Sequence, residues 1–347
     1  MKRAVWIAVT VLGAPRAYAD ATINFFGDVD YEFQSQEKTT NTFQASNLDI
    51  FANETEGKFS FIGEMIVEAF QSNEFGIDVD RLEVEYKATP WLRLCAGRIR
   101  AAFGYYGDAY QNGKFFMVPV SWPEMYEGNG FDGILPSHAI GLHADTSYSL
   151  GEKTGKLTLD AEILNGRGKD LGEVPAFADE NNEKAFNFRL RFVGAGDLEG
   201  LTVGANAYVD RIPDDTTEGA EHPGMHETIF GAHAAYLAHD LHLIAEANWF
   251  RHREDGTQTL HHTVAAFGEA GMTFSDFTPY FRYQYFWFSD SDPYFASSGI
   301  ETGNHQIYSA GAKYAASASV AFKLEAGLDH DDESIDEYVT AQSAFAF

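Results

Sequence analysis

The chain has 347 residues with 52 Asp or Glu and 24 Lys or Arg, giving a formal net charge of −28 at pH 7. A chain this acidic repels nucleic acid, so nucleic-acid binding is excluded as a function. Its single cysteine, Cys95, excludes an intrachain disulfide and a CxxC metal site.

Residues 1–19 are predicted to be a secretory signal peptide outside the fold. Lys2 and Arg3 give a charged start, residues 4–14 form an apolar run, and AYA at 17–19 fits a small-residue cleavage site. The apolar run is too short for a membrane-spanning helix, which needs about 20 residues. We expect cleavage after Ala19 and a single barrel domain over 20–347.

After the leader, segments of about ten residues alternate apolar and polar side chains, which is typical of strands with one apolar and one polar face. They lie at 24–33, 42–52, 58–70, 76–87, 91–100, 138–149, 155–166, 184–193, 201–212, 227–238, 241–252, 261–274, 277–289, 304–316, 319–329 and 336–347. Short and long connections alternate between them, as do the periplasmic turns and extracellular loops of outer-membrane barrels. The sequence therefore predicts an all-β fold, a closed antiparallel transmembrane β-barrel of about sixteen strands.

Three features favour a membrane barrel over a soluble β-sandwich. The strands are long, aromatic residues gather near strand ends as in YQYFWF at 283–288, and the last strand ends on Phe347. A strand in lipid cannot leave backbone groups unpaired, so such a sheet closes on itself. Sixteen strands then leave an open lumen, which eight strands would fill with side chains.

One connection breaks the pattern. Residues 101–137, which follow the strand ending in GRIR, are rich in Gly, aromatic residues and Pro and have no clean period. Connections this long are usually functional or disordered, and the few charges here argue against disorder. We expect this segment to fold into the lumen and narrow it beside Arg98 and Arg100.

Charged strand residues are expected to face the lumen, because a Lys or Arg facing lipid at the membrane midplane costs about 2–4 kcal/mol. Opposed rows of acid and base across a pore set its ion preference. The predicted pore-lining and constriction residues are Arg81, Arg93, Arg98, Arg100, Tyr105, Tyr106, Asp108, Arg189, Arg191, Arg282, Asp28, Asp30 and Glu64. The neighbouring acids Glu32, Glu68, Asp78, Asp80, Glu83 and Glu85 are expected to face the arginines.

The segment 97–143 resembles a group of bacterial outer-membrane porin-like proteins, broadly of the phosphate-selective porin type. The residues that carry the resemblance are Gly97, Arg98, Gly104, Tyr105, Gly133, Ile134, Leu135, Pro136 and Gly141. The sequence departs from that pattern at Ala101 and Ala102, where a polar residue and a proline are expected. The resemblance implies a porin-like channel and identifies no solute.

These patterns predict a porin of the bacterial outer membrane that passes small hydrophilic solutes or ions by diffusion and is not an enzyme. The excess of acid suggests a weak cation preference, although the clustered arginines leave an anion site open as an alternative. A second alternative is a barrel sheath around an electron carrier or other partner protein, which needs an unobstructed lumen. A third is an outer-membrane hydrolase; Ser137 and His138 are neighbours, but adjacent strand residues are expected to point apart.

No cofactor or metal is predicted. The histidines are scattered, and GNGFDG at 128–133 lacks the strand and the acidic residue of a dinucleotide site. The expected partners are outer-membrane lipid and lipopolysaccharide, bridged through divalent cations to acidic runs at 214–221, 290–292 and 329–337. A homotrimer is compatible with a barrel of this size.

Overall fold

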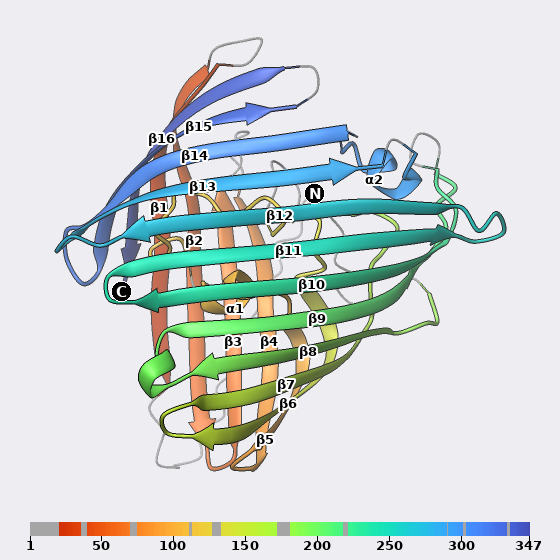
Figure 1. Ribbon diagram of the computed structural model, residues 1–347, viewed down its shortest axis with the longest axis horizontal. Helices are drawn as coiled ribbons and strands as arrows, with labels where there is room; N and C mark the ends of the chain where they lie inside the picture. Colours follow the sequence, from red (N-terminus) through yellow and green to blue (C-terminus); the bar gives the residue numbers. More distant parts are fainter. Residues whose placement is uncertain are drawn as a thin grey trace, which may run out of the picture.

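The computed structural model describes residues 21–35, 40–69, 75–110, 113–126, 133–171, 181–217, 221–289, 291–300, 303–331 and 334–347. Sixteen strands form one closed antiparallel barrel, as the alternation predicts (Figure 1). The strands are β1 (Thr22–Ser35), β2 (Thr40–Glu56), β3 (Phe59–Ala69), β4 (Phe75–Thr89), β5 (Leu92–Arg100), β6 (His138–Gly151), β7 (Gly155–Leu164), β8 (Ala185–Gly194), β9 (Leu201–Ile212), β10 (Met225–Ala238), β11 (Leu241–Glu254), β12 (Leu260–Met272), β13 (Phe277–Phe288), β14 (Gly303–Ala315), β15 (Val320–His330) and β16 (Ile335–Ala346). Three short helical turns join them: α1 (Tyr106–Ala109), η1 (Gly196–Leu198) and α2 (Pro293–Ser297).

The barrel closes between its first and last strands. Phe26 lies opposite Ala346, and the backbones of Phe25 and Phe347 exchange hydrogen bonds of 2.6 and 2.8 Å. Each other strand pairs with its sequence neighbours, so the sheet has no free edge. Backbone pairing around the whole circumference is what a sheet needs in order to lie in hydrocarbon.

The two faces of the wall differ as the alternation predicts. On β8, Phe188 and Leu190 are each 53% exposed on the outside, whereas Asn187 and Arg189 at the alternate positions are 0% and 3% exposed and face inward. The same division holds on β15, where Phe322 and Leu324 face out and Lys323 faces in. Apolar residues therefore cover the outside, and the charged residues collect in the interior.

Short turns gather at one end of the barrel and long connections at the other, also as predicted. The β10–β11 turn is only two residues, His239 and Asp240, both with positive φ (54° and 64°), which is the backbone of a tight type I′ hairpin. Figure 1 shows this turn at the left of the view, with α2 and the β11–β12 connection at the right.

Strand ends differ from the predicted bounds by a few residues. The largest difference is in β2, which runs to Glu56 instead of 52 because Asn53 to Glu56 pair with β3 across a tight turn at Gly57. This stretch, NETE, has no apolar alternation, and backbone hydrogen bonding does not require any. Among the described residues, no helix is long and apolar enough to cross a membrane.

Several predicted features fall outside the described residues. They are the leader at 1–19, most of GNGFDG at 128–133, and parts of the acidic runs at 214–221, 290–292 and 329–337.

Candidate permeation site

The connection between β5 and β6, residues 101–137, contacts inward-facing side chains from distant parts of the wall. The backbone N–H of Ala102 donates to Glu162 on β7 (3.0 Å). Lys323 on β15 donates to the carbonyl of Pro119 (2.8 Å), and Ser121 pairs with Glu325 on the same strand (3.0 Å). The segment leaves from two adjacent strands and meets strands far round the barrel from them.

Glu246 on β11 holds the start of α1. Its carboxylate, 3% exposed, accepts hydrogen bonds from the backbone N–H groups of Tyr105 (2.9 Å) and Tyr106 (2.6 Å) and from the Tyr126 hydroxyl (2.6 Å). The first N–H groups of a helix have no partner within the helix, and an acid supplies one. Gly104 has φ +55°, and a Cβ there would lie 1.9 Å from a Glu246 carboxylate oxygen, so this close approach requires glycine.

Arg282 on β13 is fully buried and joins wall and segment. Its guanidinium forms two bonds to Glu269 (2.8 and 2.6 Å) and donates to the carbonyl of Ser121 (2.8 Å) and to the hydroxyl of Tyr106 (2.7 Å). It also lies 5.4 Å from the centre of the Tyr106 ring. His242 contacts the other oxygen of Glu269 at 2.6 Å. The fully buried guanidinium group of Arg282 therefore has partners both on the wall and on the segment.

Asp108 on α1 lies between two arginines of β8. It forms an ion pair with Arg189 (2.9 Å) and another with Arg191. Burial alone would raise the pKa of Asp108, but the two guanidinium groups outweigh it and hold that pKa below its usual range. Asp160 on β7 binds Arg189 from the other side (2.9 Å).

Glu124 in the same segment has a different environment. Burial raises the pKa of its carboxyl to about 7; His305, 3.9 Å away, opposes this rise and Asp329 adds to it. Its backbone N–H donates to Gln284 on β13 (2.9 Å). The group is therefore only partly ionised near neutral pH.

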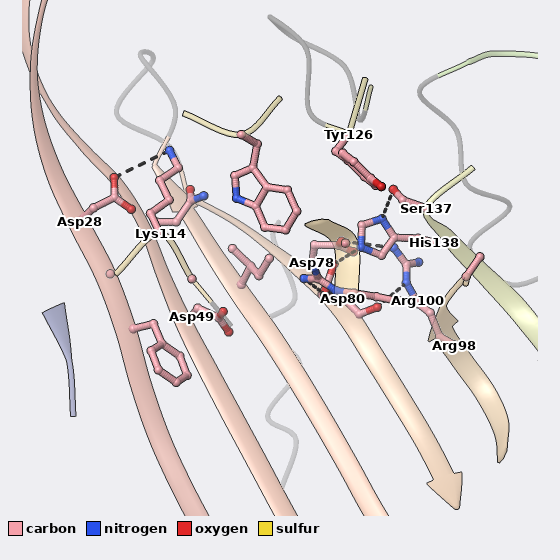
Figure 2. Close-up of a pocket in the computed structure, with 18 residues that line it drawn as sticks. Asp28, Asp49, Asp78, Asp80, Arg98, Arg100, Lys114, Tyr126, Ser137 and His138 are labelled. Atoms are coloured by element: carbon pink, nitrogen blue, oxygen red, sulfur yellow. Dashed lines mark hydrogen bonds and ion pairs between the residues drawn. The ribbon is translucent and has the colours of Figure 1, made fainter. Parts of the chain in front are cut away.

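A first cavity of about 150 Å³ lies between this segment and the wall formed by β1 to β6. Figure 2 shows Asp28 and Asp49 on one side of it and Arg98, Arg100 and His138 on the other. The remaining lining residues are Phe26, Gly27, Asn47, Ile66, Asp78, Asp80, Ala101, Gly107, Gly113, Lys114, Trp122, Tyr126 and Ser137.

The basic groups of the first cavity are matched by acids. Arg100 donates two hydrogen bonds to Asp80 (2.6 and 3.1 Å), and Arg98 forms a longer contact with Asp78 (3.3 Å). Lys114 lies 3.9 Å from Asp28 (Figure 2).

Asp49 differs from these acids. It is 6% exposed, no ion pair to it within 4 Å is found among the described residues, and its Oδ1 atom is buried without a hydrogen-bond partner, but its carboxyl group shares a hydrogen bond with Glu64 and interacts with Arg81 and Arg100 at longer range. Rings of acidic side chains along a pore favour cations, and Asp49 adds an acid to this lining that forms no close ion pair with any described residue.

Ser137 and His138 correct one prediction. They were expected to point apart, but the Ser137 hydroxyl lies 3.5 Å from Nδ1 of His138, because β6 begins only at His138 and the alternation does not yet apply. Nε2 of His138 lies 2.8 Å from Asp80. The contacts Ser137–His138–Asp80 follow the order of a hydrolase triad. The Ser–His distance, however, is longer than the roughly 2.6–3.2 Å expected between an activated nucleophile and its base. Asp80 is also already bound by Arg100.

A second cavity of about 370 Å³ lies on the other side of Arg100, along β3 to β8. Its lining includes six of the predicted pore residues: Arg81, Arg93, Arg100, Asp108, Arg189 and Arg191. Cys95 also lines it and donates to Glu83 (3.2 Å). The lining joins two arginine clusters that the sequence could not place side by side.

The predicted residues therefore divide into groups. Asp28, Arg98 and Arg100 line the first cavity, and the six residues named above line the second. The others lie outside both linings: Tyr105, Tyr106 and Arg282 in the anchoring contacts, Glu64 within 3.8 Å of Arg81 and Arg100, and Asp30 buried on β1.

Sequence reasoning missed the acids that hold the segment, Glu162 and Glu246. A signal was available: each is an acid flanked by apolar residues in an alternating strand, as in LIAEANWF, and so had to face inward. It also missed Asp49, which alternation places on the inner face of β2.

No protein-family description matches the sequence, and no curated protein matches it either. Among solved structures, the outer membrane channel DcaP of Acinetobacter baumannii is 12% identical over 96% of this chain and 98% of its own, with a TM-score of 0.63. The anion-selective porin from Comamonas acidovorans is 11% identical over 94% of this chain and all of its own (100%), with a TM-score of 0.62. OmpT of Vibrio cholerae, an outer membrane protein, is 13% identical in a loop-deletion form, with 94% and 99% coverage and a TM-score of 0.62. At these identities the comparisons show a shared fold.

Proposed function

We propose that the protein is a porin of the bacterial outer membrane, a passive channel for small hydrophilic solutes or ions. Its fold is shared over almost the full length with outer-membrane channels. The observation that carries the proposal is the set of contacts from 101–137 to β7, β11, β13 and β15. We propose that this segment folds into the lumen and narrows it, as a diffusion channel requires and a sheath around a partner protein does not.

The solute path is proposed to follow the two cavities on either side of Arg100. The segment is pinned to the β11–β15 side by Glu246, Arg282 and Lys323, so the free space lies towards β1–β8. Trimeric assembly belongs to the proposal too, since one OmpT structure was solved in a trimer form.

A weak cation preference is proposed for the first cavity. Arg98, Arg100 and Lys114 each lie beside an acid, while no ion pair within 4 Å to Asp49 is found among the described residues. Selectivity is set at the narrowest point and not by mean charge. The preference therefore rests on this local excess of acid, although one structural neighbour bears the name of an anion-selective porin.

Asp49→Asn is expected to lower the cation-to-anion permeability ratio about two- to fivefold, because it removes one acidic group from the lining of the path. Reversal potentials of single channels in a KCl gradient across a planar bilayer measure the ratio. The matched variant Asn47→Asp adds a carboxylate to the same lining and is expected to shift the ratio the other way. Equal ratios in all three proteins would refute the cation site, and absence of conductance from folded protein would refute the porin.

A further inference from the structure

The outer face of the barrel carries two neighbouring arginines at the long-loop end. Arg251 and Arg253 flank His252 on β11, and the imidazole of His252 is buried inside between Glu227 (3.0 Å) and Asp292 (2.8 Å). Since successive strand residues face opposite sides, both arginines point outward.

Histidines extend this basic patch onto both neighbouring strands. Arg253 lies opposite His226 on β10, and Arg251 lies opposite His262 on β12. His226 also contacts Asp255 (3.5 Å), which leaves the two arginines as the unpaired part of the patch within the portion of the chain that the structure describes. The four residues Arg251, Arg253, His226 and His262 are called the outer basic patch below.

The two arginines have no acidic partner among the described residues, in a chain with 52 acids and 24 bases. Arg211 on β9, two strands away, shows the contrast, since it pairs with Glu183 (2.7 Å) and Asp255 (2.5 Å). Two guanidinium groups without acidic partners are suited to an anionic ligand. The planar geometry of guanidinium favours bidentate hydrogen bonding to phosphate.

Aromatic rings lie directly below the patch. Trp249 stacks between Phe230 (5.9 Å between ring centres) and His262 (5.4 Å), both in nearly parallel planes. Such rings mark the headgroup level of outer-membrane barrels. Arg251 is the next outward residue after Trp249, about 7 Å further along the strand, which is the level of lipid phosphates.

A shallow apolar groove lies lower on the same strands. It encloses about 450 Å³ and is lined on its outer side by small residues, Ala234, Ala245, Gly268 and Ala270, with Leu243 and Phe281 at its rim. The outward positions next to the groove are again small, Ala232, Ala247 and Ala266, and the row Phe230, Trp249 and Val264 lies between these positions and the arginines. The groove therefore continues as a strip of small side chains towards the arginines, and the aromatic row of Phe230 and Trp249 separates the strip from them.

We propose that the outer face of β10–β12 binds one phosphorylated lipid of the outer leaflet. The phosphate lies on Arg251 and Arg253, and an acyl chain occupies the groove. This site differs from a cation-bridged contact with the acidic loops, because it needs no divalent ion. It rests on the proposed membrane location and not on channel activity.

The test is native mass spectrometry of the purified protein in neutral detergent, titrated with bisphosphorylated lipid A. Arg251→Gln with Arg253→Gln is expected to weaken binding about thirtyfold, because a Lys or Arg near an anionic headgroup contributes roughly 1 kcal/mol. Lys153→Gln with Lys156→Gln removes the same charge at the short-turn end and is expected to leave binding unchanged. Dephosphorylated lipid is expected to bind weakly to all variants.

A second variant tests the groove. Ala245→Phe fills it without touching the arginines and is expected to weaken lipid A binding severalfold while preserving single-channel conductance. Competition by millimolar inorganic phosphate would identify a free-phosphate site and overturn the lipid assignment. Wild-type affinity for lipid A in the double arginine variant would also overturn the lipid assignment. So would variants on this face that lose the trimer but keep lipid A binding, because that result would assign the face to a second copy of the chain.

Discussion

Replacing residues 102–136 by a linker of about five Gly and Ser residues is expected to raise single-channel conductance severalfold, because a barrel of this size has an aqueous bore once nothing crosses it. The ends of the deletion are suited to a short link: Arg100 lies opposite His138, and Ala101 donates to the carbonyl of Ser137 (2.8 Å). Conductance in planar bilayers and the size limit for sugars in liposome swelling measure the change.

The wall is expected to survive this deletion. Glu162, Glu246 and Arg282 lose partners from the segment, but lumen water then reaches them, so none becomes a buried unpaired charge. Heat-modifiable migration on gels checks folding. Glu246→Ala, which releases only the start of α1, is expected to give an intermediate, fluctuating conductance. Wild-type conductance in the folded deletion would show that 101–137 lies outside the path.

Arg282→Met is expected to destabilise the barrel by about 3–5 kcal/mol, the usual cost of breaking a buried ion pair by removing one partner. Arg282 is 0% exposed, and its removal leaves Glu269 buried with only His242 as a partner. It also removes two hydrogen bonds to the segment, at Ser121 and Tyr106. Urea-induced unfolding in lipid vesicles measures the loss.

The matched control is Arg93→Met on β5. Arg93 also pairs with two acids, Asp145 (2.6 Å) and Glu85 (2.7 Å), but its side chain is 49% exposed, so the expected cost is about 1 kcal/mol or less. Adding Glu269→Gln to Arg282→Met is expected to recover part of the stability, since the uncompensated charge is then gone. Equal losses for Arg93→Met and Arg282→Met would show that burial does not govern these pairs.

Most of the fold could be predicted from the alternation of apolar and polar side chains along the sequence. On β8, the run FNFRLRF could bury its arginines only by facing them away from the phenylalanines, and this period of two specified both faces and the strand number. The NETE stretch was not predicted as part of β2, because its backbone pairs with β3 without any alternation of apolar and polar side chains. The contact between Ser137 and His138 was not predicted, because Ser137 lies just outside β6 and the alternation does not apply to it.

The candidate site was accessible only in part. The arginines near 81–100 and 189–191 could be assigned to the inner face from sequence. That both clusters line one cavity, and that Asp108 lies between Arg189 and Arg191, depends on where the segment 101–137 lies. Nothing local links Arg282 to Ser121 or Glu246 to Tyr106, since 161 and 140 residues separate them.

The sequence by itself determined a closed sixteen-stranded wall, its two faces and its two kinds of end, because strand period and turn residues are local properties. Only the tertiary structure decided which charges meet, that Asp49 lines the first cavity without a close ion pair to another described residue, and which outward arginines lie above an apolar groove. These contacts depend on the register between strands and on the path of an aperiodic segment that single long-range contacts anchor. Neither the register nor that path can be derived from any short stretch of the chain.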